Sequence, residues 1–101
     1  MNAANELIED LLAIHKTIHD VIAFNIKIQD EYYENKIHIF GQSLTKQELD
    51  ILDIEYDNGY GTEELFGVIL FNDNTWLERE EYDGSEWWQY RKTPTIKEIL
   101  E

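Results

Sequence analysis

The chain has no cysteine, a single proline and few basic residues, and each shortage excludes a class of protein. The absence of cysteine excludes disulfides, thiolate catalysis and cysteine-based zinc sites. No apolar run approaches the roughly 20 residues that a helix needs to cross a bilayer. Residues 1–6 lack the basic charge of a targeting sequence, so we expect a cytoplasmic protein.

Acidic residues dominate the charge of the chain. There are 22 aspartates and glutamates against 8 lysines and arginines, which gives a net charge of -14. Such a chain repels nucleic acid and anionic membranes and attracts basic protein surfaces. Hydrophobic residues still make up 43% of the sequence, enough for a folded core, and 101 residues predict one domain over 1–101.

The first part of the chain has the spacing of an amphipathic helix. Asn5 is a suitable capping residue, and acidic residues follow it where the helix dipole favours negative charge. Apolar residues then recur at intervals of three and four. These residues are Leu7, Ile8, Leu11, Leu12, Ile14, Ile18, Val21 and Ile22. We therefore predict a long N-terminal helix.

The end of this helix is open to two interpretations. Phe24, Ile26 and Ile28 alternate like the residues of a strand. Phe24, Ile28 and Tyr32 also continue the helical stripe. We favour the helix, with Asn35 as its left-handed terminal residue.

The remainder of the chain is typical of short strands joined by turns. Thr45 and Glu48 have the spacing of a capping box, which predicts a short helix. Asn58-Gly59 favours a hairpin turn, and Pro94 ends the last strand because it has no amide hydrogen to donate. The expected elements are strands over 37–40, 54–56, 65–71, 75–82 and 86–92, and short helices over 46–52 and 95–100. The predicted fold is α+β, with the long helix packed on a four- or five-stranded, mainly antiparallel β-meander.

Turn length decides which side chains share a face of this sheet. We expect two-residue turns at Asp73-Asn74 and Asp83-Gly84. The register then pairs Leu70 with Leu77, and we assign their face to the core. The members of that face are Phe66, Val68, Leu70, Leu77, Arg79, Trp88 and Tyr90. The opposite face carries Ile69, Phe71, Trp76, Glu78, Glu80, Trp87, Gln89 and Arg91.

This opposite face combines tryptophan with carboxylates. An indole ring attracts a cation while a carboxylate pairs with it, so the combination suits binding of arginine or lysine. Two interpretations stay open: the N-terminal helix covers this face, or the face is left open for a partner. The predicted partner-binding residues are Trp76, Glu78, Glu80 and Trp87, with Asp57 and Tyr60 at a nearby turn.

Two patterns resemble metal sites, and both have ordinary explanations. His15 and His19 lie four residues apart, as two ligands on a helix do, but no third ligand is fixed and both flank the apolar stripe. Residues 53–59 resemble a calcium loop whose glycine falls one position late, and strand alternation explains the acids equally well. We therefore expect no metal and no cofactor.

Carboxylate pairs at glycosidase separation are also available, as they are on any acidic sheet. The candidates are Glu78, Glu80, Glu81 and Glu86. The sequence has no nucleophile elbow, phosphate loop or dinucleotide fingerprint. We therefore expect a protein that is not an enzyme.

Three segments carry a family resemblance. They are YDNGYG (residues 56–61), ELFG (64–67) and TWLEREEYDGSEWW (75–88). Their aromatic and glycine spacing, in the C-terminal half of the chain, resembles short uncharacterised proteins of tailed bacteriophages. The resemblance implies a small accessory protein made in an infected bacterium, and it assigns no activity and no functional residue.

In that context we expect an inhibitor of the anti-CRISPR or anti-restriction type, which blocks the basic nucleic-acid-binding surface of a host protein. Pure mimicry of DNA needs carboxylates arrayed like phosphates, so acids interleaved with aromatics favour a mixed contact. One alternative is a self-associating structural or virion module whose stripe from Leu7 to Val21 pairs between chains. Another is an immunity-type protein that neutralises a basic toxin.

Overall fold

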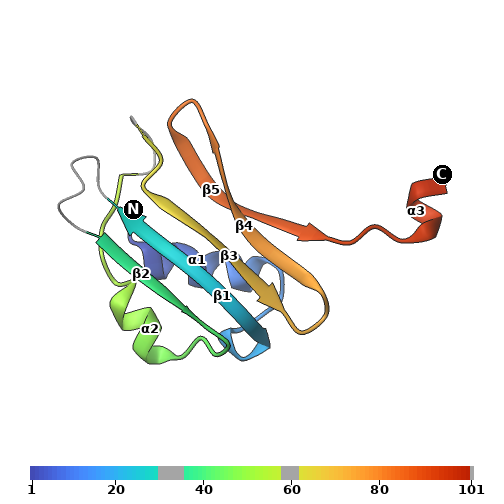
Figure 1. The fold of residues 1–101 in the computed structure, drawn as a ribbon, viewed down its shortest axis with the longest axis horizontal. Coiled ribbons are helices and arrows are strands. Elements are labelled where there is room, and N and C mark those ends of the chain that lie inside the picture. Colours follow the sequence, from blue (N-terminus) through green and yellow to red (C-terminus); the bar gives the residue numbers. More distant parts are fainter. Residues whose placement is uncertain (30–35, 58–61, 101) are drawn as a thin grey trace.

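A computed structural model describes residues 1–29, 36–57 and 62–100 of the chain. A five-stranded antiparallel sheet in the order β2-β1-β3-β4-β5 forms its centre (Figure 1). The strands are β1 (Val21–Gln29), β2 (Lys36–Gly41), β3 (Leu65–Phe71), β4 (Thr75–Tyr82) and β5 (Ser85–Lys92). The helices are α1 (Ala3–Ala13), the 3-10 turn η1 (Ile18–Asp20), α2 (Lys46–Ile51) and α3 (Ile96–Leu100). The predicted α+β class is confirmed.

The sheet is not a simple meander, which corrects the prediction in part. Consecutive strands pair from β3 to β5, but β1 lies between β2 and β3, so the chain crosses from one side of β1 to the other through α2. The strand predicted over 54–56 is only an isolated bridge between Asn2 and Glu55. The turn predicted at Asn58-Gly59 lies outside the described residues. No helix among the described residues is long and apolar enough to span a membrane.

The prediction of a long N-terminal helix is wrong. The helix α1 is capped by Asn2, whose side chain accepts from the Asn5 amide, and it ends at Ala13. His15 then adopts a φ of 60°, in the left-handed region that ends a helix. Thr17 and Asp20 form a capping box that starts η1 in a new direction.

The residues beyond η1 form β1, so the strand interpretation of this segment is the right one. Phe24, Ile26 and Ile28 are all buried, and they point to one face of the sheet as their alternation indicates. Residues 30–35, which hold the predicted helix end at Asn35, lie outside the described residues.

The two short helices occur where the sequence places them. In α2 the Thr45 amide donates to Glu48 Oε2 at 2.8 Å and Thr45 Oγ1 accepts from the Gln47 amide at 3.2 Å, which confirms the capping box. In α3 the Glu98 amide donates to Thr95 Oγ1 at 3.1 Å.

One face of the sheet holds the core. Leu7 and Leu11 of α1 are buried with Leu52, which follows α2, against strand residues such as Ile26 and Ile69. Burial of these apolar side chains is the main stabilising contribution to the fold. The alternative prediction is that the stripe from Leu7 to Val21 pairs between chains. Leu7, Leu11 and Val21 are instead buried in the core of one chain, so they are not available for that pairing.

The turn between β3 and β4 holds three residues instead of two, and this exchanges the faces of β3. Ile69 pairs with Leu77 and Leu70 with Trp76, which leaves Asn72, Asp73 and Asn74 in the loop. Asn74 takes a left-handed φ of 66°, as the last residue of a three-residue hairpin loop does. The buried residues of β3 are therefore Leu65, Ile69 and Phe71, and the predicted core residues Phe66, Val68 and Leu70 lie on the opposite face.

That opposite face is named the open face, because none of the described helices packs on it. Phe66 and Val68 remain 40% and 43% exposed there. The buried residues of α1 and the partly buried Leu49 of α2 pack against the other face, so the question of which face the helix covers is answered. The open face includes Ala23, Asn25, Lys27, His38, Phe40, Phe66, Val68, Leu70, Trp76, Glu78, Glu80, Trp87, Gln89 and Arg91.

The chain leaves the sheet after β5 as an arm, residues 93–100. Figure 1 shows this arm continuing away from the body in the direction of β5, with α3 at its far end. Every residue of the arm is exposed. The radius of gyration, 14.3 Å, exceeds the value of about 13 Å expected for a compact domain of this length.

Candidate functional site

The open face brings together four of the residues that the sequence singles out. Asp83 and Gly84, with φ of 53° and 86°, form the predicted two-residue turn between β4 and β5. The resulting register pairs Glu80 with Trp87, and it places Trp76, Glu78, Glu80 and Trp87 on one face. Asp57 lies in the connection from α2 to β3 and not on this face, and Tyr60 lies outside the described residues.

Arg91, on the edge strand β5, lies between two carboxylates of β4, and these three residues form the Arg91 cluster. Its Nε donates to Glu78 Oε1 and its Nη2 donates to Glu80 Oε1, both at 2.6 Å. Hydrogen bonds to Glu80 and Glu78 raise the pKa of the Arg91 guanidinium. The Arg91 side chain is 44% exposed, so this cluster is accessible from solvent.

An apolar hollow adjoins the Arg91 cluster. It has a volume of about 380 Å³ and lies among Ala23, Phe24, Asn25, Val68, Leu70 and Trp76. On its flank, Lys27 Nζ lies 5.7 Å from the centre of the Phe66 ring. Sequence reasoning missed the β3 side of this hollow because it placed Val68 and Leu70 in the core.

A second arginine lies on the covered side of the same hairpin, and with its partners it forms the Arg79 cluster. Arg79 Nη1 donates to Glu6 Oε2 at 3.1 Å, and Nη2 donates to Glu86 Oε1 at 2.7 Å and to the Tyr56 hydroxyl at 3.0 Å. Tyr56 also donates to Glu6. The guanidinium carbon lies 5.1 Å from the centre of the Trp88 ring, so an aromatic face completes the enclosure.

Burial determines the role of the Arg79 cluster. The side chains of Arg79 and Glu86 are 1% and 0% exposed, which denies a substrate access to them. Burial lowers the pKa of Arg79, but Glu6, Tyr56 and Glu86 outweigh it and raise the pKa overall. Burial and the hydrogen bond to Glu6 raise the pKa of Tyr56, so this phenol stays neutral. The cluster is therefore a structural one.

Glu86 also fills a gap in the sheet. The strands β3 and β4 pair at three positions, from Val68 to Leu70, whereas β4 and β5 pair at eight. Near the start of β3, the Glu64 amide donates to Glu86 Oε2 at 2.8 Å and the Leu65 amide donates to Glu86 Oε1 at 3.0 Å. The predicted catalytic candidate Glu86 thus satisfies backbone donors that have no strand partner there.

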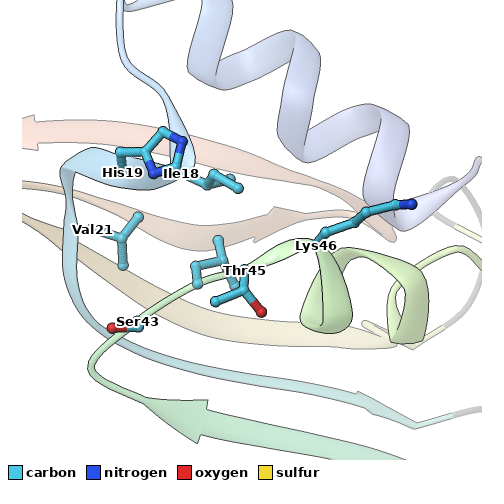
Figure 2. A pocket seen from close by; sticks show the side chains of 7 residues that line it. Ile18, His19, Val21, Ser43, Thr45 and Lys46 are labelled. Atoms are coloured by element: carbon cyan, nitrogen blue, oxygen red, sulfur yellow. The ribbon is translucent and has the colours of Figure 1, made fainter.

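A further hollow, of about 470 Å³, lies between η1 and the start of α2 (Figure 2). Its polar groups do not converge on one point, as those of a ligand site do. Figure 2 shows the amino group of Lys46 directed away from His19. The hydroxyl of Thr45 is engaged in capping α2. We assign no site to this hollow.

The structure does not assemble either of the two metal-like patterns of the sequence into a site within the described residues. His15 follows the end of α1 and His19 lies in η1, so the two do not share a helix face. Asp53 accepts from Asn2 Nδ2 at 2.7 Å and Glu55 pairs with the amino group of Met1 at 3.0 Å, which ties this segment to the start of α1. Within residues 1–29, 36–57 and 62–100, no three histidines or carboxylates are grouped to hold a metal ion.

No protein-family model matches the chain, and no curated protein or solved structure is significantly similar to it. Function is therefore inferred from the geometry of the chain itself.

Proposed function

We propose that this protein is a stoichiometric protein-binding module, whose open face binds the basic nucleic-acid-binding surface of another protein. The observation that carries the proposal is that Trp76, Glu78, Glu80 and Trp87 lie together on a sheet face that none of the described helices covers. The bacteriophage resemblance supports a bacterial host protein as the partner, and inhibition of that partner as the consequence.

The chemistry of the open face suits arginine-rich and lysine-rich surfaces. Trp87 is 38% exposed, and its indole face is available to a cation. Aromatic residues with nearby hydrogen-bonding groups are the commonest anchors of protein interfaces. The Arg91 cluster gives an internal example of the contact, because two carboxylates hold one guanidinium beside tryptophan.

The acidic charge of the protein is expected to speed the approach of a basic partner more than it strengthens the final complex. The Arg91 cluster has two carboxylates for one guanidinium, so it retains one negative charge. The net charge of -14 steers a basic partner over a longer range, and salt screens this attraction. A partner held by both the aromatic and the acidic residues is expected to bind more weakly, but not to be lost entirely, as salt is raised.

The test is an affinity capture from bacterial lysate with four forms of the protein: the wild type, Trp87→Ala, Glu80→Lys and the matched control Glu9→Lys. Glu9 lies exposed on α1, so its variant makes the same charge change away from the open face. Captured proteins are identified by mass spectrometry and then assayed for nucleic-acid binding with and without the protein.

The proposal expects a nucleic-acid-binding protein that is retained by the wild type and by Glu9→Lys and is lost with both open-face variants. Its binding to nucleic acid must fall as the protein is added. Equal capture by all four forms, or a captured protein whose nucleic-acid binding is unchanged, contradicts the proposal.

A further inference from the structure

The arm presents apolar side chains that have no packing partner in the described fold. Ile96, Ile99 and Leu100 are 77%, 66% and 80% exposed. Their spacing of three and four residues places them on one side of α3. A helix of this length is unstable in water by itself, so its formation depends on a surface that covers this side.

The apolar hollow of the open face is the complementary feature. Val68, Leu70 and Trp76 line it, and Val68 is 43% exposed. The described part of the chain therefore carries both a projecting apolar helix and an apolar hollow. In the structure the arm extends away from its own sheet, so the hollow and the arm of one chain do not meet (Figure 1).

The charge of the arm differs from that of the rest of the molecule. Within residues 93–100 the charges of Lys97 and Glu98 cancel, and the Arg91 guanidinium just before the arm is already paired with Glu78 and Glu80. The chain as a whole carries a charge of -14, so the acidic body of a second copy does not repel the neutral arm as it would an acidic segment.

We infer that two copies of this chain exchange arms, so that Ile96 and Ile99 of each copy occupy the hollow of the other. A reciprocal exchange buries both arms and both hollows about a two-fold axis, which closes the assembly as a dimer. The inference does not depend on the proposed function. It does use Trp76 of the same face, so a bound partner and the second copy's arm compete.

The experiment measures molar mass by light scattering and sedimentation equilibrium across a concentration series. The variants are Ile99→Asp in the arm, Leu70→Asp in the hollow and the matched control Leu12→Asp. Leu12 lies on α1 and is 66% exposed, the same fraction as Ile99, so it controls for an apolar-to-acidic change at an exposed site. Circular dichroism of each variant reports that the fold is retained.

The wild type and Leu12→Asp are expected at twice the 12.1 kDa mass of one chain, and Ile99→Asp and Leu70→Asp at one chain mass. A wild type that stays monomeric throughout the series overturns the inference, as does a dimer that survives Ile99→Asp. Ile99→Asp leaves Trp87 and Glu80 intact, so undiminished capture of a partner by this variant separates failure of the dimer from failure of the proposed function.

Discussion

The two faces of the β4–β5 hairpin each carry an arginine between two glutamates, with opposite consequences. On the covered face the Arg79 side chain is 1% exposed, and its carboxylates come from the neighbouring strand at Glu86 and from the distant helix α1 at Glu6. On the open face Arg91 is 44% exposed, and both of its carboxylates lie on the neighbouring strand. Burial makes the loss of one partner of the first cluster costly, whereas solvent leaves the second cluster free to exchange partners.

Adjacent tryptophans repeat this contrast. Trp88 is buried against the Arg79 guanidinium, and the absence of a side chain at Gly67 makes room for it. A Cβ at Gly67 would lie 3.2 Å from the Trp88 ring and 2.6 Å from the Asn25 carbonyl oxygen. Trp87 points to the opposite side and stays accessible. One strand thus provides a core residue and a candidate contact residue at successive positions.

The largest expected effect breaks the Arg79 cluster. Arg79→Met leaves the carboxylates of Glu6 and Glu86 buried without their counterion, and the free energy of unfolding should fall by about 3–5 kcal/mol. Arg91→Met is the matched control and should leave the stability nearly unchanged, since solvent screens that cluster. Urea titration of both variants measures the difference. Equal losses would contradict the contrast between the faces.

An effect of similar size tests the register of β3. Phe71 is fully buried and Phe66 is 40% exposed, although the sequence-based register assigns them the other way round. Phe71→Ala should lower the free energy of unfolding by about 3–5 kcal/mol, while Phe66→Ala should cost less than about 1 kcal/mol. Thermal and urea unfolding of both variants measures these losses. If the two-residue turn were correct, Phe66→Ala would be the more destabilising of the two.

A smaller effect is expected at the two turns that set the faces. Gly84 has a φ of 86°, so Gly84→Ala strains the backbone and should cost about 1–2 kcal/mol. Asn74 has a φ of 66°, and Asn74→Gly should leave the stability nearly unchanged because glycine adopts this conformation freely. Thermal unfolding distinguishes the two variants, and a stabilised Gly84→Ala would contradict the assigned turn.

The smallest expected effect is a pH dependence that arises beside the Arg79 cluster. Burial raises the pKa of Asp10 and of Glu63 above the ordinary values of 3.8 and 4.5. The folded state therefore holds these protons more tightly than the unfolded state, and stability falls as pH rises through the raised values. Melting temperature should therefore increase modestly as pH is lowered from neutral towards these raised pKa values. Asp10→Asn combined with Glu63→Gln should flatten this rise.

At more acidic pH the stability is expected to fall, not rise, as pH is lowered. The hydrogen bond from Lys16 lowers the pKa of Asp73 from 3.8 to about 2, so its contribution is present above the ordinary value and is lost as pH falls towards 2. Asp73→Asn should therefore reduce the loss of melting temperature in acid. If Asp73→Asn and the wild type lose the same melting temperature in acid, the Lys16 contact has no effect on stability.

Turn chemistry explains how much of this site is predictable from the sequence. Asp83-Gly84 offers only one two-residue turn, so the faces of β4 and β5 are predicted correctly. Three successive turn-forming residues, Asn72-Asp73-Asn74, leave the loop length undetermined, and a shift of one residue exchanges the faces of β3. The hollow therefore could not be predicted, although the two tryptophans and two glutamates of the same face could.

Local capping explains the error at the first helix. The apolar spacing of residues 21–28 fits both a helix and a strand, and helical periodicity alone extends the helix too far. The spacing of Thr17 and Asp20 is a helix-start signal that indicates a new element before Val21. The Arg79 cluster has no such local signal, because its members are separated by up to 80 positions between Glu6 and Glu86.

The separation of these partners has a consequence for how the chain folds. The α1 helix, the segment at Tyr56 and the β4–β5 hairpin each supply part of the Arg79 cluster. A chain with only some of these segments in place encloses a charge that lacks its counterion, which makes partly folded states unfavourable. The contacts of the single Arg79 side chain thus make folding more cooperative, and we expect an all-or-none unfolding transition.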